Sequence, residues 1–251
     1  MHRRYPVLRV RAMSLCIASH AYNQRHHKRQ IILCSDALAG DEYSTSETTL
    51  KFDIRLGTEV AILFAGTVDY AEDAISTYRD RLSKVSLTLS GYKEELYVGF
   101  QEFSDSLIRR GVERPDVQLL IAGFIEGEPR ITYVDSHGVQ LIPSVAAIGS
   151  GAYMADAILR WRKPDQYLST HAALYFVYEA KRLGEASPSV GKVRTHIQIL
   201  EELNGGGFRV STLLPKALSY LSNQFEKFGP QEFKGENDAF PWEALFTHRG
   251  C

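Results

Sequence analysis

The sequence has little of what marks secreted or membrane-spanning proteins. Only three of its 251 residues are cysteine (Cys16, Cys34 and Cys251), which favours the reducing cytoplasm over a disulfide-stapled secreted fold, although one bridge stays open. No stretch reaches the roughly 18 consecutive apolar residues of a membrane-spanning helix. The apolar run after Arg4 spans only residues 5–8, shorter than the roughly 7–15 residues that a secretory signal needs. We therefore expect a cytoplasmic protein without membrane partners.

The common motifs of cofactor and metal chemistry are also missing. The chain has no GxxxxGK[ST] phosphate loop, no CxxC pair and no HExxH motif. His20, His26 and His27 lie close together in sequence, but no carboxylate or thiol at ligand spacing joins them. We expect them at an exposed hairpin tip, and we expect neither a metal site nor a cofactor.

Acidic side chains are absent from the first 35 residues, although the whole chain has a net charge of −1. Seven basic residues lie in that segment: Arg3, Arg4, Arg9, Arg11, Arg25, Lys28 and Arg29. The other 22 of the 29 basic residues and all 30 acidic residues follow, so the remainder carries a net charge of −8. An acidic body repels phosphate, which argues against nucleic acid as a partner. We expect residues 1–12 to be a basic arm that is disordered or lies on the surface.

The spacing of apolar residues predicts groups of strands that alternate with pairs of helices. Predicted strands cover 14–19, 31–35, 49–54, 59–65, 117–124, 130–134, 145–148, 192–200 and 208–213. Predicted helices cover 68–82, 96–107, 152–161, 168–183 and 218–225. This order favours an α+β fold with helical layers packed on antiparallel sheets. We expect one domain at 14–229, an N-terminal extension at 1–13 and a C-terminal tail at 230–251.

Several features of the chain could carry chemistry. Ser14 opens the first predicted strand, Asp36 ends the second, and Lys51 follows fifteen residues later. Glycine-containing turns at 64–67 and 148–152 each join a strand to a helix. Each feature alone has an ordinary explanation as a strand, turn, surface or packing residue. Their order along the chain is what indicates a site.

In this order the sequence resembles the proteasome β-type family of N-terminal nucleophile (Ntn) hydrolases, over about residues 14–200. In that family a nucleophile opens the first strand, an Asp follows the second, and a Lys comes after it. A glycine turn then precedes the first helix, and a G-S-G turn opens the third. The matching residues here are Ser14, Asp36, Lys51, Gly66 and Gly149-Ser150-Gly151. Residues 13–18 are also similar to the start of bacterial proteasome-related proteins (Anbu, HslV-like). The resemblance implies a four-layer α-β-β-α sandwich of the Ntn-hydrolase/proteasome type.

The resemblance further implies that Ser14 is the nucleophile and that its own α-amine is the base. A serine hydroxyl is a poor nucleophile until a base takes its proton, and a free α-amine with a pKa of about 7.7–8.0 can do so. An ammonium group at Lys51 would favour the neutral amine, and Asp36 would hold that ammonium in place. Gly66 would let a backbone N–H approach the developing oxyanion, and Ser150 would relay protons.

The N-terminus departs from the family pattern. The family nucleophile is usually Thr and is the first residue of the mature chain, whereas thirteen residues precede Ser14 here. We expect residues 1–13 to be either a propeptide removed by autolysis or a misassigned start, with translation beginning at Met13.

Two further departures concern supporting residues. The later Asp of the family aligns with Ser187 in the segment 186–191, so Ser187 and Ser189 are supporting candidates without a carboxylate. The family's Asp-Ser-Arg run is Asp36-Ala37-Leu38 here, which removes a charge that helps to bind substrate.

The leading hypothesis is an N-terminal hydrolase that cleaves peptide or amide bonds. The first alternative is a catalytically inactive ring subunit, and a second is an amidase for a small molecule. The resemblance implies a stacked-ring homo-oligomer, a peptide or protein substrate and an ATPase unfoldase as a candidate partner.

Overall fold

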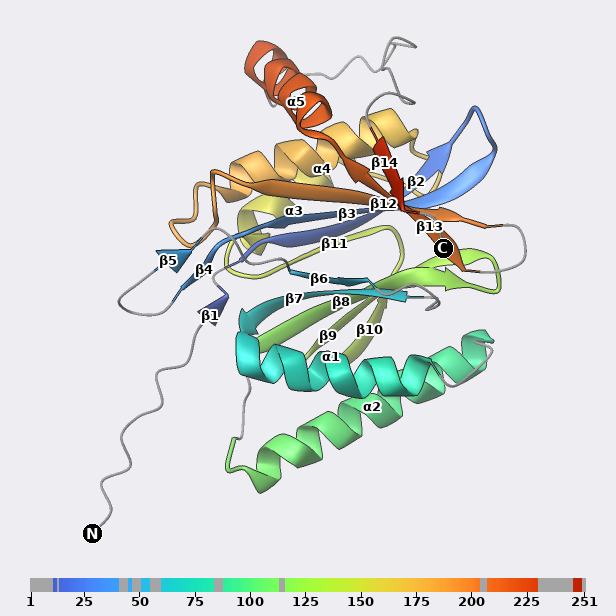
Figure 1. The fold of residues 1–251 in the computed structure, drawn as a ribbon, viewed down its shortest axis with the longest axis vertical. Coiled ribbons are helices and arrows are strands. Elements are labelled where there is room, and N and C mark those ends of the chain that lie inside the picture. The colour runs from blue at the N-terminus through green and yellow to red at the C-terminus, as the bar shows by residue number, and fades with distance from the viewer. Residues whose placement is uncertain are drawn as a thin grey trace.

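A computed structural model describes residues 11–12, 14–40, 45–46, 51–54, 60–83, 88–112, 116–203, 207–229 and 246–249. These residues form four layers, in which two antiparallel sheets lie face to face and helices cover both outer faces (Figure 1). The predicted α-β-β-α sandwich is therefore confirmed. None of the described helices combines the length and apolar content that crossing a bilayer requires.

The first sheet has the strand order β10-β9-β8-β7-β1-β4-β5, with β6 also paired to β7. Its strands are β1 (Arg11–Ala12), β4 (Ala39–Gly40), β5 (Thr45–Ser46), β6 (Phe52–Ile54), β7 (Val60–Thr67), β8 (Val117–Ile125), β9 (Glu128–Asp135) and β10 (Gly138–Ile142). The second sheet has the order β11-β2-β3-β12-β13-β14. Its strands are β2 (Cys16–Asn23), β3 (Lys28–Asp36), β11 (Val145–Ile148), β12 (Thr195–Glu202), β13 (Phe208–Leu213) and β14 (Phe246–Arg249).

Helices cover the outer face of each sheet. The first sheet is covered by α1 (Val68–Leu82) and α2 (Leu89–Arg109), and the second by α3 (Ala152–Arg162), α4 (Thr170–Gly184) and α5 (Pro215–Phe228) (Figure 1). Three apolar clusters fill the spaces between the four layers. Removing this surface from water is the main force that holds the layers together.

Local sequence explains where α2, α4 and α5 begin. The Thr88 hydroxyl accepts a hydrogen bond from Gly91 N at the start of α2, and the Ser169 hydroxyl accepts one from Ala172 N at the start of α4. Both satisfy backbone donors that a helix leaves free at its first turn. Proline is favoured at this position because its missing N–H has no partner to lose, and α5 begins with Pro215.

The predicted elements lie where the sequence analysis expects them, with differences at their ends. Strands β2 and β3 run further into the hairpin than predicted, so only residues 24–27 form its turn. β10 and β14 are not predicted, and neither is the pairing of β1 within the proposed N-terminal extension. Residues 1–10, 13, 55–59, 230–245 and 250–251 lie outside the described residues, including Cys251, most of the extension and most of the tail.

His20 corrects one expectation, because it is not at the exposed hairpin tip. It lies within β2 and is only 4% exposed, whereas His26 and His27 are exposed in the turn. Neither ring nitrogen of His20 has a hydrogen-bond partner among the described residues. Burial, and secondarily the Arg130 guanidinium, lowers its pKa from 6.5 to about 4.

We expect His20 to make folding sensitive to acid. A base whose pKa is lowered by folding stabilises the protein fully above pH 6.5 and loses this contribution as the pH falls toward 4. The loss amounts to about 3 kcal/mol. In denaturant unfolding followed between pH 7.5 and 4, His20→Leu should therefore lose less stability than the wild type. The exposed control His26→Gln should follow the wild-type curve, and parallel curves for His20→Leu and wild type would contradict the assignment.

Candidate functional site

Ser14 and Asp36 meet because β2 and β3 pair as a hairpin, with Cys16 opposite Ser35. In this register the end of β3 lies beside Leu15, the residue that follows Ser14. The Asp36 N–H donates to the Leu15 carbonyl at 3.1 Å, and the Leu15 N–H donates to Asp36 Oδ1 at 2.9 Å. Ser14 and Asp36 are fully buried.

Lys51 completes a buried ion pair with Asp36. Its Nζ lies 2.6 Å from Asp36 Oδ1, and both side chains are fully shielded from solvent. Lys51 directly precedes β6, and its carbonyl accepts from Phe64 N of β7 at 3.4 Å. One carboxylate oxygen thus joins Lys51 to the backbone beside Ser14. The structure brings together the three residues that the sequence analysis places at the centre of the site.

The second oxygen of Asp36 is held by a residue that the sequence analysis does not single out. Gly191 N donates to Asp36 Oδ2 at 2.7 Å. A Cβ atom at Gly191 would lie 3.0 Å from Leu38 Cβ and 3.2 Å from Asp36 Oδ2, so a side chain would crowd this contact. Gly191 contributes only its backbone N–H to this contact, so no side-chain pattern in the sequence could indicate its role.

The turn at Gly149-Ser150-Gly151 wraps the carbonyl group of Ser14. The Ser150 hydroxyl and the Gly151 N–H each lie 3.3 Å from the Ser14 carbonyl oxygen as donors. Gly149 has φ +94°, and a Cβ there would stand 2.3 Å from the same oxygen. Ser150 therefore lies next to Ser14, and its hydroxyl contacts the backbone of that residue.

Gln118 is a further residue of this region that sequence reasoning missed. Its Oε1 accepts from Gly149 N at 2.8 Å, and its Nε2 donates to the Tyr133 hydroxyl at 3.0 Å. Tyr133 in turn donates to Asp135 Oδ2 at 2.9 Å. This chain of bonds ties the glycine turn to β8 and β9. A glutamine within an apolar strand, at 117–125, is the one signal that could have indicated it.

Gly66 lies at the end of β7, where the backbone makes a close approach. Its φ is +107°, and a Cβ would stand 2.1 Å from the Asp116 carbonyl oxygen. The neighbouring Thr67 N–H donates to that oxygen at 2.6 Å. Only glycine satisfies both the left-handed conformation and this distance.

Residues just upstream of Ser14 add a strand at the same place. Ala12 of β1 pairs with Gly66, and Arg11 pairs with Thr67 on one side and with Gly40 of β4 on the other. An extended backbone segment therefore lies between β7 and β4, two residues before Ser14.

Ser187 and Ser189 lie on the loop between α4 and β12. Their hydroxyls are 3.3 Å apart. The loop reaches the site through the backbone of Gly191, while the two serine side chains contact each other.

The buried thiols near the site are not reactive groups. Burial raises the pKa of Cys16 far above its usual range, although Lys51 opposes the shift, and it raises the pKa of Cys34 to about 12. Both are therefore neutral thiols, and Cys16 donates to the Phe64 carbonyl at 3.3 Å. Cys16 packs between the sheets and Cys34 under the helices, so the two point to opposite faces and stay free.

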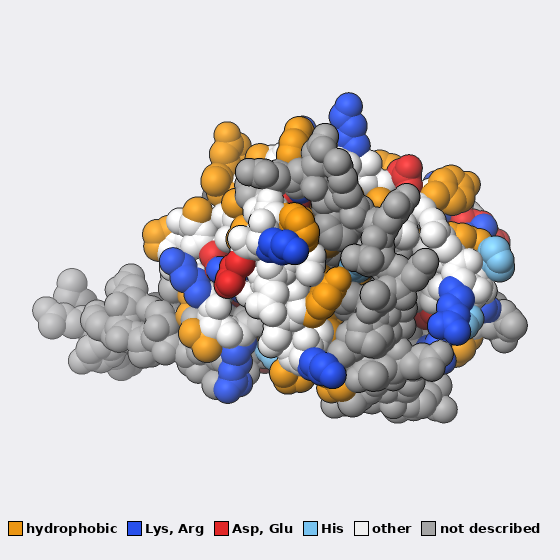
Figure 2. Space-filling view, turned by 90° about the horizontal axis from the view of Figure 1, so that it is seen from above, with side chains coloured by type: hydrophobic (Ala, Val, Ile, Leu, Met, Phe, Trp, Pro, Cys, Tyr) orange, Lys and Arg blue, Asp and Glu red, His pale blue; other side chains and the backbone are white. Residues whose placement is uncertain are grey.

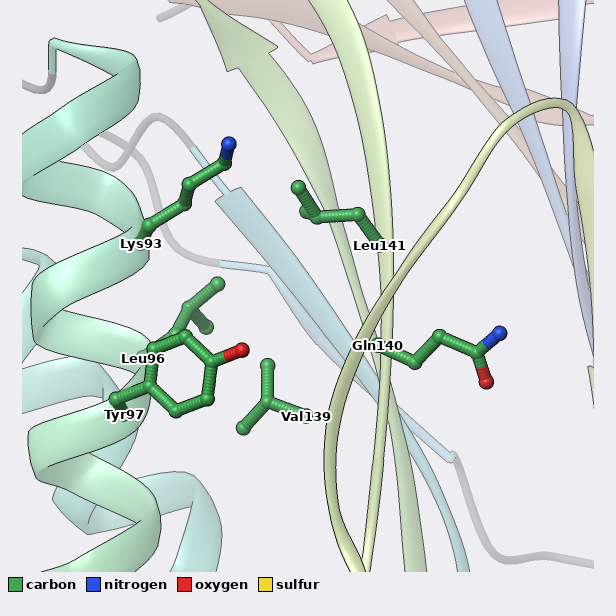
Figure 3. A pocket seen from close by; sticks show the side chains of 6 residues that line it. All are labelled: Lys93, Leu96, Tyr97, Val139, Gln140 and Leu141. Carbon is green, nitrogen blue, oxygen red and sulfur yellow. The ribbon is translucent and has the colours of Figure 1, made fainter.

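Other regions offer less chemistry. A hollow of about 300 Å³ lies between α2 and β10, lined by Lys93, Leu96, Tyr97, Val139, Gln140 and Leu141, and it includes none of the residues around Ser14 (Figure 3). The described residues contain no group of three or more His, Cys, Asp or Glu side chains placed to hold a metal ion. Seen from above, the coloured Lys and Arg side chains are scattered rather than gathered in one patch (Figure 2).

Comparison with known proteins gives both a family match and a structural match. Residues 26–183 match the family model described as proteasome subunit. The fold is similar to a solved structure of an Anbu (Gly-1) mutant from Hyphomicrobium sp. strain MC1, with a TM-score of 0.63 and 15% identity. That alignment covers 85% of this chain and 94% of the other. No curated protein matches the sequence.

Proposed function

This chain belongs to the proteasome subunit family, and from that premise we propose that it is an N-terminal nucleophile hydrolase of peptide or amide bonds. The observation that carries the proposal is the buried Lys51–Asp36 pair, bonded to the backbone beside Ser14. Burying two charges costs desolvation free energy, which their attraction offsets only when the geometry is good. We therefore infer that the pair is kept for what it positions beside Ser14.

In the proposed reaction Ser14 Oγ attacks the scissile carbonyl carbon and its proton passes to the free α-amine of the same residue. The Lys51 ammonium keeps that amine neutral by charge repulsion, and Asp36 holds the ammonium. The leaving amine takes the proton, an ester joins the acyl group to Ser14, and water then hydrolyses this ester. A backbone N–H at Gly66 stabilises the oxyanion, a contribution of about 2.7–4 kcal/mol where such a donor has been removed in other enzymes. Ser150 relays protons beside Ser14.

An extended peptide is the proposed substrate. The pairing of β1 with β7 and β4 supports this, because the same backbone groups can pair with a substrate strand once the upstream segment has left. In the intact chain the nitrogen of Ser14 is an amide and cannot serve as a base. The proposal thus requires that residues 1–13 be removed, or that the chain be made from Met13 and lose that Met.

The N-terminus of the purified native protein tests the proposal. We expect intact mass and N-terminal sequencing to find a mature chain that begins at Ser14. A native protein that keeps residues upstream of Ser14 and still hydrolyses peptides would exclude the α-amine as the base.

Ser187 supports a second candidate function, an inactive ring subunit. The loop carries no carboxylate at the position where the family has an Asp, and Ser187 contacts Ser189 instead. A mature chain beginning at Ser14 that neither reacts with an electrophilic inhibitor nor cleaves peptides would favour this structural role over hydrolysis.

Both candidate functions include self-assembly in stacked rings in the cytoplasm, with an ATPase unfoldase as a candidate partner. Light scattering should therefore give a mass many times that of the 28.2 kDa chain. A monomer at high protein concentration would contradict the assembly.

A further inference from the structure

Two buried ion pairs each include one residue of α4, and the proposed reaction uses neither. Arg162 Nη2 lies 2.8 Å from Glu179 Oε1, with side-chain exposures of 9% and 0%. Lys181 Nζ bonds to Glu185 Oε1, with exposures of 0% and 9%. Replacing such pairs by apolar residues is often neutral for stability, so their presence points to a positional role.

The Lys181–Glu185 pair lies where α4 ends and the loop toward the site begins. The Glu185 N–H donates to the Lys181 carbonyl at 3.1 Å, closing the last turn of the helix. Arg182 Nε lies 3.5 Å from the other carboxylate oxygen of Glu185. Two cations of α4 therefore fix the first residue of the loop 185–191.

The loop then runs a short, hydrogen-bonded path to Asp36. Ser187 N donates to the Gly184 carbonyl at 3.0 Å, and Val190 N donates to the Ser187 carbonyl at 3.1 Å. The next residue is Gly191, which donates to Asp36 Oδ2. Only five residues thus separate Glu185, at the fixed end of the loop, from Gly191 at the site.

Close contacts at the end of α4 and at Val190 tie this part of the chain to Leu15 and to the turn at 149–151. A Cβ at Gly184 would stand 2.4 Å from Leu15 Cδ2, and one at Gly151 would stand 2.5 Å from Val190 Cγ2. Glu185, Val190 and Gly191 are buried at the two ends of the loop, whereas Ala186 and Pro188 between them are exposed. Because both ends are closely packed, we expect a shift at Glu185 to reach Gly191.

The Lys181–Glu185 pair and the Lys51–Asp36 pair influence the same neighbouring groups. Burial first, and Arg194 second, lower the pKa of His196, while Asp36 raises it and both Lys181 and Lys51 lower it. The pKa of Cys34, raised mainly by burial, is lowered by Lys181 and raised by both Asp36 and Glu185. Lys181 and Glu185 therefore lie within electrostatic reach of the same groups as Lys51 and Asp36.

We propose that Lys181 and Glu185 are positioning residues, whose pairing holds the loop 185–191 so that the Gly191 N–H meets Asp36. Asp36 in turn orients Lys51, so the pair acts on Ser14 through Gly191, Asp36 and Lys51. The effect on turnover rests on the proposed function, whereas the effect on the Gly191 contact does not.

A double variant tests the inference without leaving a buried charge alone. Lys181→Met with Glu185→Leu should make amide hydrogen exchange in the segment 186–191 faster by about tenfold, measured by mass spectrometry. The matched control, Arg162→Met with Glu179→Leu, removes the buried pair between α3 and α4. It should leave exchange in the segment 186–191 unchanged. Unchanged exchange in the first variant, or an equal increase in both, overturns the proposal.

Kinetics of the processed protein give the second readout. For the Lys181/Glu185 variant we expect kcat to fall about 10- to 100-fold with little change in KM, because a displaced ammonium affects chemistry more than binding. Lys181→Arg keeps the charge and should retain most of kcat. A kcat unchanged in the double variant of an active protein overturns the inference. If the wild type shows no turnover but the exchange difference is present, the proposed function fails while the positioning role stands.

Discussion

Replacing Ser14 by Ala is expected to abolish both peptide hydrolysis and covalent labelling by an electrophilic inhibitor. In the proposed reaction the Ser14 hydroxyl oxygen forms the bond to the acyl group. Removal of a nucleophile typically lowers turnover by a factor on the order of 10³ or more. Labelling is read by intact mass, and hydrolysis by a fluorogenic peptide.

Ser19→Ala is the matched control for this substitution. Ser19 lies on β2, which begins two residues after Ser14, is 1% exposed, and donates to the His20 carbonyl at 3.1 Å. It should label at the wild-type rate and mass. Labelling that persists in Ser14→Ala at another residue would show that the nucleophile lies elsewhere.

The second large effect is expected at the buried ion pair. Asp36→Asn leaves the Lys51 ammonium buried without its counter-charge, and breaking a buried pair in this way costs about 3–5 kcal/mol of the free energy of unfolding. The substitution also replaces one of the two oxygens that accept from the Leu15 and Gly191 N–H groups, so one of these groups loses its acceptor. Turnover should therefore be lost as well. Denaturant unfolding monitored by circular dichroism measures the first effect, and peptide hydrolysis measures the second.

Asp53→Asn provides the comparison for exposure. Asp53 accepts from Arg79 Nε at 3.0 Å, but each side chain is 23% exposed, so water replaces part of what is lost. Its cost should be about 1 kcal/mol or less. Lys51→Ala should remove turnover like Asp36→Asn, and wild-type turnover in Lys51→Ala is the outcome that rules out the proposed charge arrangement.

Much of the architecture follows from sequence periodicity. The apolar spacing between Val68 and Leu82 predicts α1 with its observed bounds, and the helix buries Tyr70, Ala74 and Tyr78 along one face. The strand at 208–213 is likewise predicted with its observed bounds. Such elements can be predicted because a buried face imposes its period on the chain.

The strands β10 and β14, which the sequence analysis does not predict, lack such a periodic apolar pattern. β10 forms the edge of its sheet, with Gln140 and Leu141 exposed, so its apolar pattern is weak. β14 pairs with β13 at the other sheet's edge, far along the chain from the rest of the domain. A strand stabilised by backbone pairing at an edge leaves little trace in side-chain order.

The site shows the same division. Ser14, Asp36 and Lys51 can be picked out because their side chains differ from the apolar strands around them, and the structure brings these three together. Gly191 cannot be picked out in this way, because its part in the site is one backbone N–H. Gln118 does differ from the apolar strand around it, but its contact with the turn at 148–152 depends on the packing of the two sheets, which the sequence does not give.

The carboxylate of Asp36 also sets an order of events during synthesis. Its donors come from Leu15 near the start of the chain, from Lys51, and from Gly191 some three-quarters of the way along it. A nascent chain whose Gly191 is still inside the ribosome has Ser14 but lacks the last of these donors. The buried arrangement around Asp36 can therefore be completed only after Gly191 has emerged from the ribosome.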